Sequence, residues 1–415
     1  MTFLRNFGPG LITACAAIGT SHFVQATRAG SYFGFDLLWL VLAVHIAKYP
    51  FIEFGNRYTS ATNENLLEGY WHFSKPVFYL ITLLSIAFTP FSFAANGIIC
   101  AGIIKAVFNL PHSIAFITIL LLLFCTIIIS IGHYKLLDSA MKIFIILLSF
   151  TTLAAVIMAA QNFTALPQSE IFYSDYSPLE MRHLPFLIAL MGFMPGNIDL
   201  SVWHSLWLKA KNRTANALNF KQARIDFNTG YVITIITAIL FLSIGALTIN
   251  NSNLAVPDGA DNFAKLIISS YAGSIGAWVT PIVGIAILAA MFSTVLAVVD
   301  SYPRLLTESY KIVKNNSENS KNRRFMHSSL MLLYSILAGL IVIFLASDFK
   351  KVLDLTTTIA FVIAPIYAFV NYKIVTGKLL AKKFQPGIFI RILSWLGLIF
   401  LTGFLAFFIY LKVFL

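Results

Sequence analysis

Two short polar runs interrupt long apolar stretches of this 415-residue chain. Residues 19–22 read Gly-Thr-Ser-His in the middle of the apolar segment 8–34. Glycine relaxes the backbone, and threonine and serine hydroxyls compete for backbone hydrogen bonds, so this run favours a break in a helix. Residues 194–197 read Met-Pro-Gly-Asn within the segment 184–209, where proline removes a helical hydrogen bond. Both runs therefore predict exposed carbonyls and amides around a small polar site.

The side chains in and beside these runs could carry several kinds of chemistry. The His22 imidazole can ligate a metal, accept a proton or bind an organic solute, or it can tie down the unwound backbone. The Met194 thioether suits softer metal ions unless it only packs in the core, and the Asn197 carbonyl is a hard oxygen ligand. Asp199 either supplies negative charge to the site or caps the second half-helix.

These observations define the expected site. The residues predicted to line it are Gly19, Thr20, Ser21, His22, Met194, Pro195, Gly196, Asn197 and Asp199. For a metal ion, the expected ligands are His22, Met194, Asn197 and the backbone carbonyls near Ala16 and Met191. Histidines and charged residues inside an apolar span usually face the bundle interior, so a possible proton route or gate is assigned to His45, Lys48 and His204. Arg28 is expected to reach the outer membrane interface or to guard the entrance.

Composition places the chain in the membrane. It is 58% hydrophobic and only 11% charged, with mean hydropathy +0.82; soluble domains are about a quarter charged. The net charge of +12 arises in short loops between apolar spans, which argues for topology and against nucleic-acid binding. The three cysteines fall within apolar spans and are expected to be buried thiols, and no cofactor is expected. An enzyme using His22 and Asp199 is disfavoured because no catalytic motif accompanies them.

Apolar segments of about 20 residues are candidate spans. The sequence predicts an all-α bundle of about eleven, at 8–34, 36–57, 76–107, 112–132, 139–160, 184–209, 228–249, 273–299, 328–347, 352–375 and 389–414. Two broken spans at matching places in two halves indicate an inverted-repeat transporter. The expected division is a first repeat at 1–160, a second at 184–375 and an extra helix at 389–415.

Loop charges predict the orientation in a plasma membrane or inner membrane. One set of loops is basic and the alternate set is poorer in bases, which places the N-terminus in the cytoplasm and the C-terminus outside. Examples are Arg304, Lys311, Lys314, Lys321, Arg323 and Arg324 in a basic loop, and Glu170, Asp175 and Glu180 in an acidic one.

The chain resembles the Nramp family of divalent metal transporters over nearly its whole length. The opening Gly-Pro-Gly at 8–10, the polar turn at 62–66 and the segment 132–135 are similar to family motifs. Residues 194–197 resemble the Met-Pro-His-Asn motif of the family's sixth helix. The resemblance implies a LeuT-like fold, with helices 1 and 6 broken, and alternating access.

The departures from the family predict an altered site. The family's first helix reads Asp-Pro-Gly-Asn where this chain has residues 19–22, so Gly19 and His22 replace a carboxylate and an amide ligand. The acidic residues that the family uses for protons on helix three fall at Phe93 and Asn96. From the family resemblance we expect a divalent metal ion as the substrate, whereas the departures raise an alternative. The alternative is a small polar organic solute or a non-transition-metal cation, without proton coupling.

Overall fold

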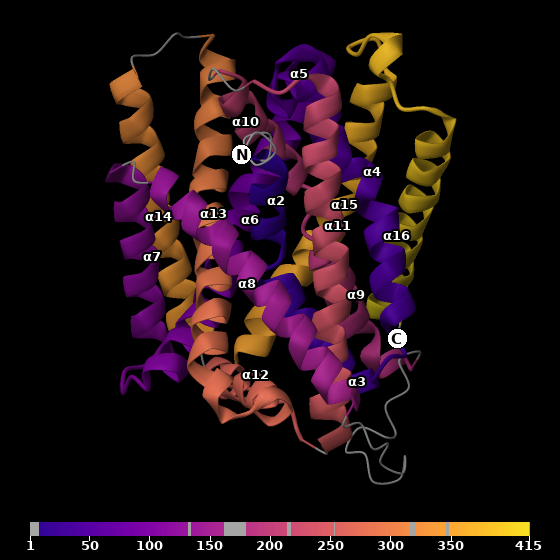
Figure 1. The fold of residues 1–415 in the computed structure, drawn as a ribbon. Coiled ribbons are helices and arrows are strands. Elements are labelled where there is room, and N and C mark those ends of the chain that lie inside the picture. The colour runs from indigo at the N-terminus through magenta and orange to yellow at the C-terminus, as the bar shows by residue number, and fades with distance from the viewer. Residues whose placement is uncertain are drawn as a thin grey trace.

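The computed structural model describes residues 8–131, 134–161, 180–213, 217–252, 254–315, 320–345 and 348–414. These residues form a helical bundle, and no strand occurs among them. Most helices run along one common direction, while α12 (Ala260–Ile275) closes one end and α5 (Leu66–Phe73) lies at the other (Figure 1). Gly132, His133, Glu170 and Asp175, which entered the family resemblance and the predicted topology, lie outside the described residues.

Eight helices of the described part are long and apolar enough to cross a membrane. They are α4 (Leu38–Thr62), α6 (Lys75–Phe108), α7 (Ile114–Ile131), α11 (Phe220–Ile244), α13 (Thr280–Lys314), α14 (Ser320–Leu345), α15 (Phe349–Thr376) and α16 (Ile388–Phe414). The 28-residue α8 (Tyr134–Gln161) and two interrupted helices complete the polytopic architecture that the sequence predicts.

The first interrupted helix consists of α2 (Pro9–Ala17), a π-helical turn η1 (Ser21–Ala26) and α3 (Thr27–Phe33). The predicted break is confirmed, but it lies at Ile18 and Gly19, and Thr20 already has helical backbone angles. A Cβ atom on Gly19 would approach Thr294 Oγ1 of α13 to 2.2 Å. The chain therefore bends where a glycine permits this close approach, and the hydroxyl residues after it resume a helix.

The second interrupted helix consists of α9 (Leu184–Phe193) and α10 (Leu200–Asn212). Met194 is extended, with φ −79° and ψ 132°, as expected for a residue that precedes proline. Residues 194–199 contain no helix, so this predicted break is confirmed at its expected place.

One predicted span had the wrong boundaries. The apolar run 273–299 crosses the boundary between α12 and α13, where Gly276 has φ +123° and a short 3-10 turn follows. Only glycine adopts this backbone conformation without strain. Hydropathy averages across such a boundary, and it also misses the polar second half of α13, which remains helical to Lys314.

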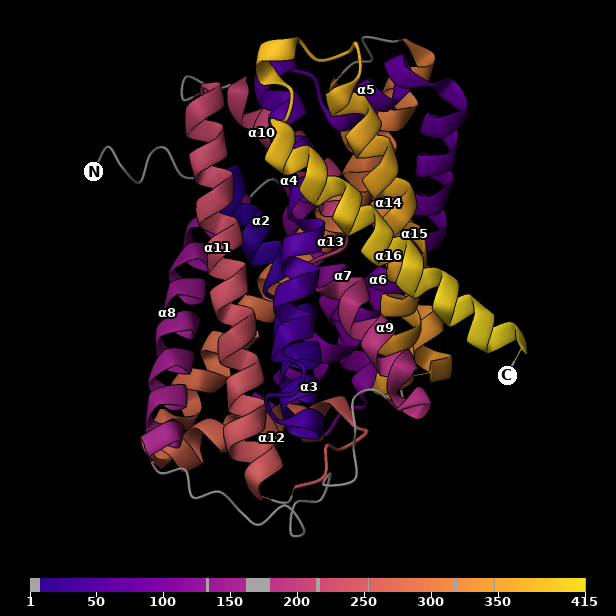
Figure 2. The same ribbon diagram turned by 90° about the vertical axis from the view of Figure 1, so that its right-hand side faces the viewer.

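The broken helices lie inside the bundle. α2 packs against α11, α10 and α13, and α9 packs against α15, η1 and α16. The outer helices α7, α14 and α16 carry exposed large apolar side chains, such as Phe124 at 54% and Phe344 at 80% exposure. α16 crosses the outside of the bundle at a slant (Figure 2). An apolar outer surface around a polar centre is the organisation of a multi-pass membrane protein.

Candidate functional site

A small cavity of about 40 Å³ lies where the two breaks meet. Its polar lining comes from both broken helices and from the neighbouring α6 and α13. Six of the residues predicted at the sequence level line it, and they are Ala16, Thr20, Ser21, Gly196, Asn197 and Asp199. A water molecule needs only about 10–15 Å³ of such volume, so the cavity can hold a small ion with very few waters.

Asp199 is the carboxylate in the wall of this cavity. Its side chain is buried, and Oδ2 accepts a hydrogen bond of 2.7 Å from the Tyr302 hydroxyl. Oδ1 has no hydrogen-bond partner among the described residues. Asp199 stands at the start of α10, but its side chain makes no capping hydrogen bond there. A buried carboxylate oxygen without a partner is costly, so this atom is available to a cation or a donor in the cavity.

Neutral oxygens form much of the remaining polar wall. The Thr20 hydroxyl donates to Asn96 Oδ1 at 2.7 Å, and Asn96 Nδ2 donates to the Ser92 carbonyl at 2.7 Å. Thr294 of α13 also faces the cavity and donates to the Cys15 carbonyl at 3.2 Å. These hydroxyl and amide oxygens are hard ligands, the kind that magnesium, calcium and manganese prefer.

His22 is fully buried and lies outside the cavity lining. Nε2 is 2.9 Å from the Thr234 carbonyl of α11, and Nδ1 is 2.6 Å from the Ser21 hydroxyl and 3.0 Å from the Ala17 carbonyl. Both ring nitrogens therefore stand within hydrogen-bond distance of backbone carbonyls, and these contacts tie the ring to α11 and to the end of α2. This geometry favours the backbone-anchoring role of His22, and its role as a metal ligand stays a prediction.

Lys48 of α4 is buried beside the second break. Its ammonium donates to the Gly192 carbonyl at 2.8 Å and to the Gly196 carbonyl at 3.2 Å. Gly192 belongs to the last turn of α9, where the helix dipole is negative, so a cation is stabilised there. Gly196 also lines the cavity. The structure therefore places a tethered positive charge beside the cavity.

The other two residues of the predicted proton route lie apart from each other. The His45 ring stands 6.0 Å from the His22 ring, centroid to centroid, and its Nε2 has no partner among the described residues. His204 lies on α10 and bridges Thr13 Oγ1 at 2.7 Å and Asn56 Oδ1 at 3.1 Å. His204 thus joins α10 to α2 and α4, and a proton role for His45, Lys48 and His204 remains a prediction.

Gly19, Met191, Met194 and Pro195 are not among the residues that line the cavity. Met191 and Met194 are fully buried in the hydrophobic core. The position of Gly19 is closed by Thr294, so a larger side chain has no room there. In this conformation the retained methionine of the family motif therefore packs as a core residue.

Arg28 lies on α3 and is buried. Its guanidinium makes two bonds to Asp354 of α15, at 2.7 and 3.1 Å, and lies 5.0 Å from the centroid of the Phe186 ring. Two bonds from one guanidinium to one carboxylate make a strong, oriented pair. Of the two expectations for Arg28, its position fits a guard between α3 and α15.

Sequence reasoning missed several residues of the cavity wall. Ser92 and Asn96 line it from α6, Thr294 from α13 and Trp203 from α10, although only Asn96 had drawn attention, through the family resemblance. The available signal was polar side chains four residues apart, as at 92 and 96 of α6. In the described ranges no three His, Cys, Asp or Glu side chains gather as a metal cluster. Binding of a metal would therefore depend on Asp199 together with neutral oxygens.

Comparison with known proteins agrees with this architecture. Residues 10–411 match the family model described as natural resistance-associated macrophage protein-like, Nramp. An uncharacterized protein of Pasteurella multocida is 32% identical over 97% of this chain and 91% of its own length. The divalent metal cation transporter MntH of Staphylococcus aureus is 25% identical over 60% of this chain and 57% of its own length.

Solved structures show the same fold. A manganese transporter of Eremococcus coleocola superposes with TM-score 0.70 and 13% identity, over 97% of this chain and 85% of that chain. Mhp1, a nucleobase-cation-symport-1 family transporter, gives TM-score 0.59 and 12% identity over 88% and 78%. These likenesses extend the LeuT-like arrangement to this chain. With the family model covering nearly all of its residues, the chain belongs to the Nramp family of membrane transporters.

Proposed function

We propose that this protein is a secondary-active transporter that moves a divalent metal ion by alternating access, through a site that differs from that of its family. The observation that carries the proposal is the cavity between the two breaks, with its buried carboxylate oxygen at Asp199. Its volume of about 40 Å³ suits an ion and is too small for an organic solute in this conformation.

The donor set favours a hard cation. Thr20, Asn96 and Asn197 offer neutral oxygens and Asp199 offers the negative charge, whereas the Met194 sulfur lies outside the lining. Manganese and magnesium both accept such ligands, and a thioether site would instead favour cadmium or other soft ions. We infer that the altered first break has exchanged a charged metal site for a mostly neutral one.

Lys48 sets the electrostatic conditions for loading. With its ammonium on the Gly196 carbonyl beside the cavity, Lys48 repels an arriving divalent ion, while the Asp199 carboxylate attracts it. The affinity for metal is consequently expected to be lower than in a site with two carboxylates.

Alternating access needs closures on both sides of the cavity. On the side of α3, the partly buried Arg28–Asp354 pair is the proposed outer closure, joining the first repeat, 1–160, to the second, 184–375. On the opposite side, the Asp226 carboxylate accepts hydrogen bonds from the amides of Gly8 and Gly10 at the start of α2. We keep the predicted orientation, with the N-terminus cytoplasmic and the C-terminus outside.

Uptake into proteoliposomes tests the proposal. Manganese, magnesium, calcium and cadmium are offered to the full-length protein, and binding is measured in parallel by calorimetry. Asp199→Asn is expected to weaken binding about 100-fold, because it removes the charge that compensates the ion. Asp258→Asn is the matched control, since Asp258 is an exposed acid paired with Lys350.

The outcomes separate the two readings. Uptake of manganese or magnesium that Asp199→Asn abolishes and Asp258→Asn preserves supports the proposal. No binding of any of the four ions would overturn it and leave the small polar organic solute as the substrate class.

A further inference from the structure

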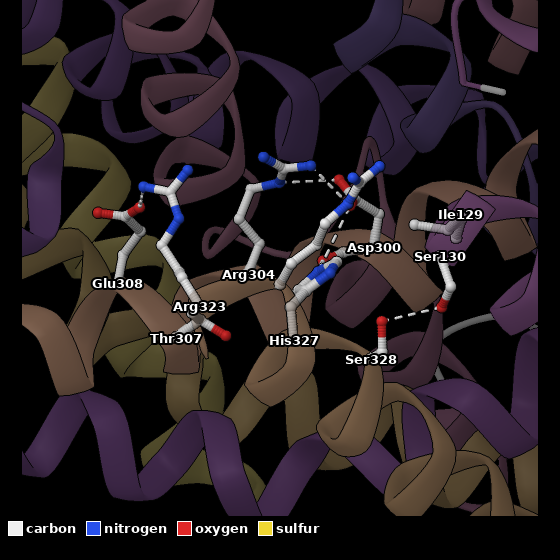
Figure 3. A pocket seen from close by; sticks show the side chains of 10 residues that line it. Ile129, Ser130, Asp300, Arg304, Thr307, Glu308, Arg323, His327 and Ser328 are labelled. Atoms are coloured by element: carbon white, nitrogen blue, oxygen red, sulfur yellow. Dashed lines mark hydrogen bonds and ion pairs between the residues drawn. The ribbon is translucent and has the colours of Figure 1, made fainter. Parts of the chain in front are cut away.

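A second, larger cavity lies away from the transport site, between the ends of three helices. It has a volume of about 360 Å³ and is enclosed by the last turn of α7, the second half of α13 and the first turns of α14. Figure 3 shows its wall, where basic side chains outnumber acidic ones. The basic groups are Arg304, Arg323, Arg324 and His327, and the acids are Asp300 and Glu308.

Both acids are already paired with basic groups. Arg304 holds Asp300 with two bonds, Nε to Oδ2 at 2.9 Å and Nη2 to Oδ1 at 2.7 Å. Glu308 lies 3.4 Å from Arg323 (Figure 3). It also lies 3.7 Å from Lys311. These carboxylates therefore do not cancel the remaining cations of the cavity.

Arg324 supplies the excess charge. No hydrogen bond or ion pair joins its side chain to the rest of the described chain, and the side chain is exposed. Elsewhere in the lining, the Ser130 hydroxyl donates to the Ser328 hydroxyl at 3.0 Å, and the Ser328 hydroxyl adds a neutral donor. Guanidinium and hydroxyl donors around a cavity of net positive charge are the groups that bind a phosphate.

The surroundings of the cavity are apolar and face outward. Phe325, next to Arg324, is 76% exposed, and Ile131 at the end of α7 is 59% exposed. Both α7 and α14 are outer helices of the bundle (Figure 1). A basic pocket between transmembrane helices, at one end of the spans and open to their lipid-facing side, is suited to a charged lipid headgroup.

We propose that this cavity binds the phosphate group of an anionic phospholipid, with its acyl chains lying against the outer face of α7 and α14. The phosphate faces Arg324 and the hydroxyls of Ser130 and Ser328, while the Arg323–Glu308 pair joins α14 to α13. Soluble phosphate has the same chemistry, so the test must separate the two sources.

The test uses the full-length protein and native mass spectrometry. Phosphatidylglycerol, phosphatidylcholine and inorganic phosphate are titrated separately, and the thermal unfolding midpoint is followed in parallel. Arg324→Gln removes the excess charge and leaves both ion pairs in place; Ser328→Asp adds a carboxylate to the wall. Lys382→Gln is the control, because Lys382 is exposed in the turn before α16 and lies outside the cavity.

Phosphatidylglycerol is expected to bind more tightly than phosphatidylcholine, and each cavity variant is expected to weaken that binding about fivefold. Lys382→Gln is expected to bind as the wild type does. Equal binding by wild type and both cavity variants would overturn the proposal, because the basic wall would then have only a structural role. Binding of inorganic phosphate without preference for phosphatidylglycerol would also overturn the lipid assignment and identify a soluble anion as the ligand.

Discussion

Both helix breaks leave backbone polar groups without helical hydrogen bonds, and the two breaks are stabilised in different ways. The first break is satisfied mostly by its own residues, because His22 and Ser21 contact the Ala17 carbonyl and Thr294 fills the space beside Gly19. The second break is satisfied from outside, by the Lys48 ammonium on the carbonyls of Gly192 and Gly196. The first is thus closed by local packing and the second by a charge.

This difference indicates where a substrate can bind. A break whose polar atoms are already paired has little to offer a ligand, whereas the second break brings Asp199, with a free carboxylate oxygen, to the cavity. We therefore propose that, relative to the family, the substrate-binding chemistry has shifted from the first broken helix toward the second. The following substitutions test this contrast, from the largest expected effect to the smallest.

Gly19→Asp, which restores the family's carboxylate, is expected to lose about 3 kcal/mol or more of unfolding free energy. Its Cβ would stand 2.2 Å from Thr294 Oγ1, in a buried and already filled position. Thermal unfolding in detergent measures the effect. Gly19→Asp combined with Thr294→Gly should recover part of the loss, and a fully stable single variant would refute the closed first break.

His22→Ala is expected to lower the unfolding free energy by about 2–3 kcal/mol, because the buried Thr234 carbonyl loses its donor. The affinity of the surviving folded protein for manganese should stay within a few-fold of wild type. Calorimetry and thermal unfolding are measured together, with exposed His112→Ala as the control. Loss of metal binding without loss of stability would instead make His22 a ligand.

Lys48→Met is expected to tighten manganese binding about tenfold, or about 1.4 kcal/mol, since it removes a positive charge beside the cavity. Methionine keeps most of the side-chain volume. Lys351→Met, at an exposed lysine, is the matched control for the lost charge. Weaker metal binding in Lys48→Met would show that the lysine assists the ion instead of opposing it.

Met194→Leu and Thr20→Val give the finest comparison. Met194 packs in the core, so a leucine of similar volume should leave metal affinity unchanged and cost less than about 1.5 kcal/mol of stability. Thr20 lines the cavity, so removing its hydroxyl should weaken binding several-fold. Isothermal titration calorimetry measures both affinities. A larger loss of affinity in Met194→Leu than in Thr20→Val would show that the Met194 thioether is a metal ligand.

The sequence predicted the spans and both breaks because glycine, proline and hydropathy act locally. It did not predict which side chains face the cavity, since that depends on how each helix is rotated against its neighbours. Asn96 and Thr294 enter the wall from helices with little polar pattern, while His22 turns away toward the Thr234 carbonyl. The boundary at Gly276 was missed because a single positive φ leaves the apolar average unchanged.

The Lys48 contact also has a mechanical meaning. One ammonium grips carbonyls on both sides of Phe193 and Met194, where the main chain stops being helical, and α4 also meets α10 through Asn56 and His204. α4 is thereby hydrogen-bonded to the second interrupted helix on both sides of its non-helical segment. In the proposed alternating access, these two spans are therefore expected to move together.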